Sequence, residues 1–384
     1  MILTNCATCA APLGLALGKK CGRCSTRYCG PACQEQHWKE GGHDKLCKKI
    51  KKAGGVEQYH ANKKHAEAVA VAAEACAEDT KGQTCYICTQ ALHWKTKEGL
   101  VRGCACRGTA GFAHVSCLAE QAKILFAEIE GSNLDNKVFN EKWRRWDKCS
   151  LCEQEYHGVV ACALGWACWK TYVGRPEADN LRGCAMTQVG SGLYKAEHYA
   201  DAVTVEEAIL SNEQRLGTPE TDILYAQGNL ASTYHVLGRG DEALRLRRDV
   251  YSGRLEVSGK EPRETLLAAN NYAASLVDQQ RFKEAKSLLR RTTPVARLVL
   301  GASHEFTLRM SCKYARAIYE DAGATLDDLR ESVKTLEKTT QTARRVLGGA
   351  HPFVGTIEGC LKESRAALRA SEAQSTHPRA HPRC

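Results

Sequence analysis

The sequence predicts a mainly α-helical protein in which two small, irregular modules with little β structure precede a stack of helical repeats. Fourteen of the 21 cysteines fall within residues 6–47 and 85–152, where they occur in close pairs. The segment between these clusters is rich in Ala, Glu and Lys, which are strong helix formers. From about residue 176 onward, similar residues recur at intervals of 42. These three observations predict two cysteine-rich modules followed by an α-helical superhelix.

Length and composition favour a soluble chain of two or three domains. The chain has 384 residues, of which 26% are charged and 43% hydrophobic. Its first six residues show neither a basic region nor an apolar core, so we expect no secretory signal. Closely paired cysteines in a reducing compartment bind metal more readily than they form disulfides. We therefore expect metal sites and a cytoplasmic or nuclear location.

The second cluster contains seven cysteines and one histidine in four close pairs. Eight ligands are twice what one tetrahedral zinc ion requires, whereas the alternative is a set of structural cysteines in an ordinary core. The spacing, together with residues 104–114, resembles the RING-CH (RINGv) finger. The resemblance implies a cross-brace, with one zinc on pairs one and three and another on pairs two and four. These ligand sets are Cys85, Cys88, His114 and Cys117, and Cys104, Cys106, Cys149 and Cys152.

The first cluster resembles a MYND finger along its whole length. The resemblance implies two further zinc ions, on Cys6, Cys9, Cys29 and Cys33 and on Cys21, Cys24, His43 and Cys47. His37 is the rival ligand to His43, but the spacing of His43 and Cys47 places both on one helix face. MYND fingers bind short peptides on an aromatic surface. Tyr28 and Trp38 are the candidate peptide-binding aromatics, or they pack against the zinc scaffold instead.

The formal charge of +10 overstates the positive charge of the zinc-loaded chain. Each two-zinc finger adds four positive charges and seven thiolates, which lowers the total to about +4. A run of lysines remains at positions 45, 48, 49, 51 and 52. A solvated helix face or a nuclear-import signal explains this run better than nucleic-acid binding does. We therefore expect protein partners and no nucleic acid.

The expected domain boundaries follow from these patterns. Residues 1–50 form the MYND finger, 51–84 a helical linker and 85–157 the RING-CH finger. Residues 158–175 form a docking helix, since its uninterrupted apolar core of eleven residues is too short to span a bilayer. Residues 176–370 hold the repeats and a capping helix. Residues 371–384 form a disordered tail, in which metal binding by His377 and His381 is the weaker alternative.

The repeats resemble tetratricopeptide repeats of the longer, kinesin-light-chain type. Glycines at 217, 259, 301 and 348 end successive units, with an insertion in the last one. Asn229 matches Asn271 and Ala243 matches Ala285, each 42 residues apart. Each unit reads as two helices with a polar turn between them. Because one unit cannot bury its apolar face alone, stacking must make the core and a groove for peptide segments.

The motifs predict protein interaction and leave one enzymatic option. The sequence contains no phosphate loop, nucleophile elbow or zinc-protease motif, so we expect no catalytic residue. Eight ligands per finger leave neither zinc ion an open coordination position, so we expect the zinc to be structural. The RING-CH resemblance implies a ubiquitin ligase, which positions a ubiquitin-conjugating enzyme without a covalent step. Ile87 and Trp146 match the conjugating-enzyme contacts, although Trp146 also fits core packing and Trp143 competes for its role.

Two departures from active RING fingers keep a second hypothesis open. Ser150 and Leu151 stand where many of them carry a proline, and Glu153 stands where a cation often holds the donor ubiquitin. The interval between Cys117 and Cys149 is also long for the family. The alternative function is therefore a non-catalytic, zinc-stabilised adaptor or scaffold.

Overall fold

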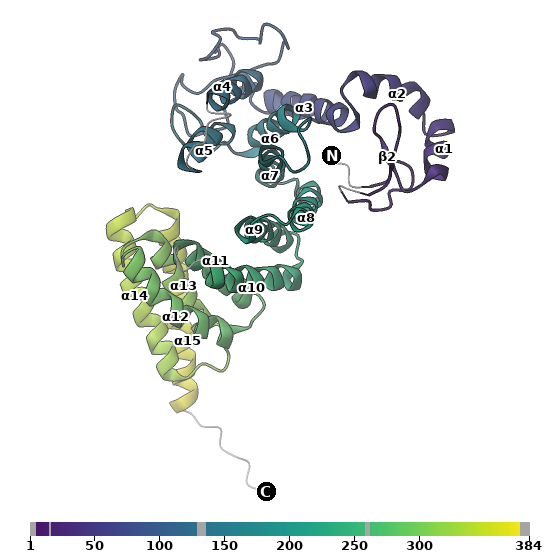
Figure 1. Cartoon of the computed structure of the whole chain (residues 1–384). Coiled ribbons are helices and arrows are strands. Elements are labelled where there is room, and N and C mark those ends of the chain that lie inside the picture. Colours follow the sequence, from purple (N-terminus) through teal and green to yellow (C-terminus); the bar gives the residue numbers. More distant parts are fainter. Residues whose placement is uncertain (1–4, 15–16, 129–135, 258–261, 377–384) are drawn as a thin grey trace. The chain divides into compact units, whose positions relative to one another are not determined.

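The structure is a computed structural model that describes residues 5–14, 17–128, 136–257 and 262–376. It divides into two compact units, residues 1–218 and 219–384. Helices dominate the described residues, as the sequence predicts (Figure 1). Their one regular sheet is a hairpin of β1 (Lys19–Lys20) and β2 (Arg27–Tyr28), with Lys19 opposite Tyr28. The mainly α-helical fold class with little β structure is confirmed.

The first unit contains both cysteine-rich modules and three helices that follow them. Most of the chain between residues 76 and 114 is irregular, and short turns and bridges give it shape. In chain order, the helices of this unit are α1 (Pro31–Lys39), α2 (His43–Lys52), α3 (Val56–Ala75), α4 (Val115–Ala127), α5 (Asn136–Trp143), the 3-10 turn η1 (Arg144–Trp146), α6 (Gly158–Tyr172), α7 (Asn180–Lys195) and α8 (Tyr199–Leu216).

Helix α6 is the buried centre of the first unit. It packs against α3, α4 and α7, and its side chains are buried around almost its whole circumference. Two glycines let α6 and α7 approach backbone to backbone. A Cβ on Gly165 would lie 2.6 Å from the Gln188 carbonyl oxygen, and one on Gly192 would lie 2.8 Å from the Ala161 carbonyl oxygen. Within the described residues, no helix is long and apolar enough to cross a bilayer.

The second unit is a stack of antiparallel helix pairs. Each helix contacts the next along the chain, which is the arrangement that the 42-residue periodicity predicts. Ala243 and Ala285, the small positions of the repeat, are both fully buried. Gly259 lies outside the described residues. The helices are α9 (Glu220–Val236), α10 (Gly240–Val257), α11 (Pro262–Asp278), α12 (Phe282–Val299), α13 (Glu305–Tyr319), α14 (Leu326–Leu347) and α15 (Pro352–Thr376).

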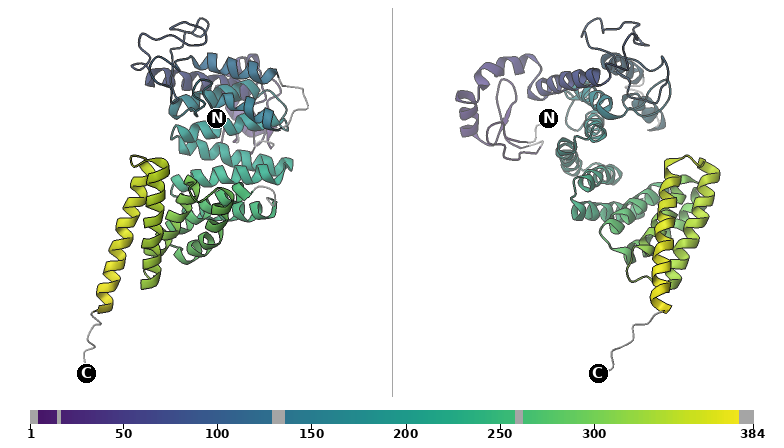
Figure 2. Two further views of the ribbon diagram at one scale, coloured as in Figure 1. Left: turned by 90° about the vertical axis from the view of Figure 1, so that its left-hand side faces the viewer. Right: turned by 180° about the vertical axis from the view of Figure 1, so that it is seen from behind.

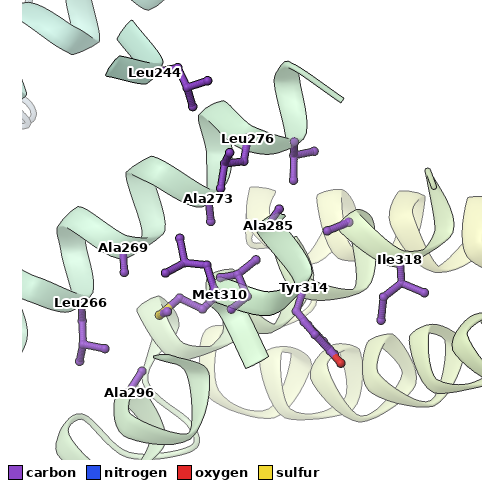
Figure 3. Packing of buried hydrophobic residues seen from close by; sticks show 14 residues of the cluster. Leu244, Leu266, Ala269, Ala273, Leu276, Ala285, Ala296, Met310, Tyr314 and Ile318 are labelled. Carbon is purple, nitrogen blue, oxygen red and sulfur yellow. The ribbon is translucent and has the colours of Figure 1, made fainter. Parts of the chain in front are cut away.

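The core of this unit runs through its helix pairs. One cluster brings small side chains such as Ala269 and Ala273 against large ones such as Met310 and Ile318 (Figure 3). A second cluster lies between α13, α14 and α15, with Leu336 and Ile357 fully buried. Helices α14 and α15 lie side by side at the C-terminal end of the unit (Figure 2). α15 therefore caps the stack.

The end of α15 differs from the sequence-based expectation. We expected a disordered tail from residue 371, but the helix continues to Thr376. Residues 371–374 consist of helix-tolerant Ser, Glu, Ala and Gln, and Pro378 is the first residue that forbids further helix. Residues 377–384, including His377 and His381, lie outside the described residues.

Candidate zinc centres

The structure brings all sixteen predicted ligands together in four groups of four. Within each group, the candidate ligand atoms all lie within 4.8 Å of one another. The groups alternate along the sequence in both modules, which is the cross-brace that the resemblances imply. They are Cys6, Cys9, Cys29 and Cys33; Cys21, Cys24, His43 and Cys47; Cys85, Cys88, His114 and Cys117; and Cys104, Cys106, Cys149 and Cys152.

The sulfur–sulfur distances fit tetrahedral zinc. Zinc–sulfur bonds of about 2.3 Å place two thiolates of one tetrahedron roughly 3.8 Å apart. The Cys21 and Cys47 Sγ atoms lie 3.9 Å apart, and those of Cys106 and Cys149 lie 3.8 Å apart. In the group that contains the exposed Cys9 and Cys29, these two sulfurs are 3.6 Å apart, and those of Cys29 and Cys33 are closer, at 3.3 Å. The thiol-rich donor sets match closed structural zinc sites, so zinc is the cofactor that fits.

Four of the close cysteine pairs are held in the same backbone turn. The carbonyl of the first cysteine accepts a hydrogen bond from the amide four residues later, as in Cys85 and Thr89 at 2.8 Å. The first cysteine's own amide donates to the carbonyl five residues later, as from Cys85 to Gln90 at 3.0 Å. The fifth residue adopts a left-handed conformation in all four turns. These residues are Ala10, Ser25, Thr89 and Glu153.

The two histidines approach their groups through different ring nitrogens. His114 Nδ1 lies 3.4 Å from Cys88 Sγ, while its Nε2 lies 3.3 Å from the Ala91 carbonyl oxygen. Donation to that carbonyl fixes the ring and leaves Nδ1 unprotonated for a metal. His43 instead places Nε2 3.4 Å from Cys24 Sγ. Burial lowers the pKa of both imidazoles, which favours the neutral form that metals bind.

His37 lies outside the metal group. Its Nδ1 is 3.0 Å from the Tyr28 hydroxyl, and its ring lies 5.0 Å from that of His43, centroid to centroid. The geometry therefore favours His43 over His37 as the ligand. Tyr28 is fully buried in this packing, so its predicted peptide-binding role was wrong. Trp38 is 42% exposed and stays available to a partner.

Gly111 shapes the last metal group. Its backbone has a φ of +85°, and a Cβ built there would lie 2.6 Å from Cys106 Cβ and 2.9 Å from Cys106 Sγ. No other residue type fits this position without displacing a ligand. Gly108, three residues earlier, has a φ of +61° but open space around its Cα. The loop therefore contains one glycine that the metal site needs and another that only the backbone turn favours.

The predicted conjugating-enzyme contacts separate in the structure. Ile87 is 37% exposed, whereas Trp146 is 1% exposed and packs against Trp143 and Tyr172. The predicted contact role of Trp146 was therefore wrong, because α6 covers this side of η1. Trp143 is also buried and does not replace it.

Leu151 is an exposed residue that sequence reasoning did not select. It is 52% exposed and holds the same place in its ligand turn as Ile87 does in the first. The amide of each points at the preceding cysteine sulfur at 3.4 Å. The shared Cys-x2-Cys spacing was the available signal. Sequence alone did not show that the two turns are neighbours.

His93 is a second residue that sequence reasoning missed. It is buried, and its ring lies 5.3 Å from the ring of His114. Its Nδ1 lies 2.8 Å from Thr96 Oγ1, which fixes the loop between the first two ligand pairs. His93 thus supports the metal group without joining it. No spacing rule distinguishes such a packing histidine from a ligand.

Three segments of the chain match known families. Residues 6–47 match the MYND finger, residues 85–133 the RING-variant domain and residues 265–305 the tetratricopeptide repeat. The chain carries a MYND finger, a RING-variant domain and tetratricopeptide repeats. The family match of the RING-variant domain ends before Cys149, so geometry alone brings its last ligand pair into the group.

Solved structures that match part of this chain include kinesin-light-chain repeats. The nearly identical TPR-like repeats of a putative kinesin light chain from Podosopora anserina share 17% identity with this chain. The alignment covers 60% of this chain and 97% of theirs, with a TM-score of 0.41. BtubC (BKLC) from P. vanneervenii shares 12% identity, with 70% and 93% covered and a TM-score of 0.37. No curated protein shows significant sequence similarity to this chain.

The domain content gives the general function. MYND fingers and tetratricopeptide repeats are protein-interaction modules, and both finger families are built around zinc. The chain is therefore a zinc-binding protein-interaction protein, whose partners are other proteins.

Proposed function

We propose that this chain is a RING-type ubiquitin ligase, which recruits substrates through its repeats and MYND finger. The sixteen residues of the four groups are the zinc ligands, and the metal supplies rigidity. The RING-variant domain would hold a ubiquitin-conjugating enzyme and its thioester-linked ubiquitin in a reactive geometry. Such a mechanism requires an exposed contact surface and no catalytic residue.

The observation that carries this proposal is the pairing of the first and last ligand turns of the RING-variant domain. The Tyr86 hydroxyl lies 3.1 Å from Ser150 Oγ, and both lie 3.4 Å from the Gln121 side-chain oxygen. The residues that follow, Ile87 and Leu151, are both exposed. Two apolar side chains on neighbouring turns, each fixed by a metal group, form a small rigid contact surface.

The charge beside this surface differs from what the sequence indicates. Glu153 alone would place a carboxylate where active ligases often have a cation. Arg145 Nη2 lies 2.8 Å from Glu153 Oε1, and Arg145 Nη1 lies 3.4 Å from the Cys149 carbonyl oxygen. The guanidinium therefore offsets the negative charge of Glu153 beside the last ligand turn. This arrangement favours the ligase over the adaptor.

The adaptor stays as the second candidate because Ser150 and Leu151 stand where many active RING fingers carry a proline. A segment without proline keeps backbone freedom that a proline ring removes, so binding the conjugating enzyme would lose more entropy. In this alternative, the same surface holds a different protein and no ubiquitin is transferred.

Self-ubiquitination of the purified full chain tests the proposal. We expect ubiquitin chains with at least one member of a panel of conjugating enzymes, and their loss in Ile87→Ala. The matched control is Leu92→Ala, since Leu92 is an apolar residue of the same domain with 59% exposure. Zinc content should stay unchanged in both variants. A zinc-loaded chain that is inactive with every conjugating enzyme would establish the adaptor.

A further inference from the structure

The exposed side of α2 is a concentrated basic surface. His43, Cys47 and Ile50 are buried on the inner side of this helix. Five of its other residues are lysines, and all five are exposed, as is one carboxylate, Asp44 in the first turn. The lysines are Lys45, Lys48, Lys49, Lys51 and Lys52.

These five lysines form no ion pair within the described residues. Some other lysines of the same unit do form ion pairs, as Lys63 and Lys64 do with Glu67 at 3.8 and 3.2 Å. Lysines three or four positions apart on a helix repel one another and destabilise it. The negative end of the helix dipole offsets part of this repulsion at Lys49, Lys51 and Lys52. A bound anion would remove the rest.

A shallow cleft, wide open to solvent, continues the basic surface onto α3. Its walls are Lys49, Lys52 and Ala53 at the end of α2, with Tyr59, Asn62 and Lys63 on α3, and its volume is about 460 Å³. Asn62 Oδ1 accepts a hydrogen bond from Gln58 Nε2 at 3.2 Å, which leaves the Asn62 amide group as a donor. A carboxylate would meet two ammonium groups that form no ion pair in the described residues, those of Lys49 and Lys52, together with an amide and a phenol. Lys63 adds a third ammonium group, which Glu67 already approaches at 3.8 Å.

The field around the cleft is positive. Burial lowers the pKa of the neighbouring His60, and nearby positive charges that include Lys63 and Lys64 lower it further. Farther along α3 the sign reverses, because Glu67 and Glu74 follow. The basic surface is therefore confined to α2 and the start of α3.

We propose that the α2 lysines and this cleft bind a short acidic segment of a partner protein. The ten residues of α2 span roughly 15 Å, the length of four or five extended residues. A nucleic-acid strand would need a basic track of several nucleotides, and the acidic residues of α3 interrupt it. The exposed face of α2 also lacks the Arg, Asn and Gln side chains that read bases. This inference does not depend on ligase activity.

Fluorescence anisotropy with a labelled hexaglutamate peptide tests the proposal. The variant replaces the five α2 lysines with glutamine, and four bound zinc ions per chain would show that its MYND finger is folded. A matched control replaces five exposed lysines on other elements, namely Lys81, Lys283, Lys334, Lys338 and Lys362. Each exposed ion pair contributes little alone, but the α2 variant removes five lysines at once. We therefore expect this variant to lose affinity for hexaglutamate by on the order of 30-fold. The control should bind like the parent chain.

Two further arms distinguish the class of partner. A hexaglutamine peptide should not bind, and Asn62→Leu should weaken hexaglutamate binding severalfold. A ten-nucleotide uridine strand should bind more weakly than hexaglutamate at the same ionic strength. Equal losses in the α2 and control variants would overturn the proposal, since net charge would then explain the binding. Tighter binding of the RNA strand through the same lysines would also overturn it.

Discussion

The Tyr86 hydroxyl lies 3.1 Å from the Ser150 hydroxyl, and these residues occupy the same position in two different ligand turns. This contact joins the first and last zinc-binding turns of the RING-variant domain. Ile87 and Leu151, the residues that follow Tyr86 and Ser150, are both exposed. The proposed partner surface thus depends on a polar contact between two zinc sites.

Loss of this hydroxyl contact should weaken the partner surface without unfolding the domain. Tyr86→Phe removes the hydroxyl's contacts with Ser150 and Gln121, each of which corresponds to about 1 kcal/mol of stability. We expect severalfold slower self-ubiquitination with zinc content unchanged. Activity equal to that of the parent chain would show that the contact does not position Ile87 and Leu151.

Gly111→Ala should remove one zinc ion of the four. The added methyl group would lie within 3 Å of two Cys106 atoms, so the ligand must move. Elemental analysis should find about three zinc ions per chain. Gly108→Ala is the matched control, because its φ is also positive but nothing lies within 4 Å. It should keep all four ions, at a conformational cost of about 1 kcal/mol. Loss of zinc in both variants would mean that strain in the left-handed backbone explains the effect and that the clash with Cys106 does not.

Chelation should unfold the fingers and spare the repeats. The MYND core consists largely of its own ligands, with Leu13, Tyr28 and Ile50 among the few other buried residues. The second unit has apolar cores of its own that contain no proposed ligand. A strong chelator should therefore make residues 5–53 sensitive to protease while the repeat helices remain resistant. Equal protease sensitivity of the repeats would show that their stability depends on zinc.

Acidification should destabilise the junction between α3 and α6. Burial, and to a lesser degree Lys170, lowers the pKa of His65 to about 4. The unfolded chain binds a proton near pH 6.5 and the folded chain does not. Stability is therefore complete above pH 6.5 and falls as the pH drops toward 4, by up to about 3 kcal/mol.

The His65→Gln variant isolates this effect from acid release of zinc. Glutamine does not titrate, whereas zinc is released from both proteins. We expect urea unfolding to show a steeper loss of stability between pH 6.5 and 4 in the parent chain. Identical pH profiles would show that His65 does not link protonation to folding.

The sequence predicted the parts of the molecule that depend on fixed spacing. Ligand turns follow from cysteines three residues apart, and stacked helices follow from matched residues such as Ala243 and Ala285. The end of α15 was predicted too early, because the polar residues from Ser371 onward have the composition of a disordered tail. No residue before Pro378 excludes a helix, and α15 continues to Thr376.

Surface roles were harder to predict because they depend on which helix covers which finger. Trp146 was expected at the surface, yet packing by α6 and Tyr172 covers it. Tyr28 is buried by His37 and His43, which are distant enough in sequence to hide the contact. Leu151 lies in a turn that contacts the turn of Ile87 through Ser150 and Tyr86, which are 64 residues apart in sequence. Tertiary packing determines the exposure of all three side chains, and such packing leaves little periodic signal in the sequence.

Single-turnover discharge tests the central claim most directly. A conjugating enzyme charged with ubiquitin is mixed with the full chain and free lysine, and loss of the thioester is followed. The account predicts faster discharge with the parent chain and with Leu92→Ala. Ile87→Ala and Leu151→Ala should each reduce this acceleration roughly tenfold with all four zinc ions retained. Discharge that Ile87→Ala and Leu151→Ala leave unchanged, or that the zinc-loaded chain never accelerates, would contradict the account.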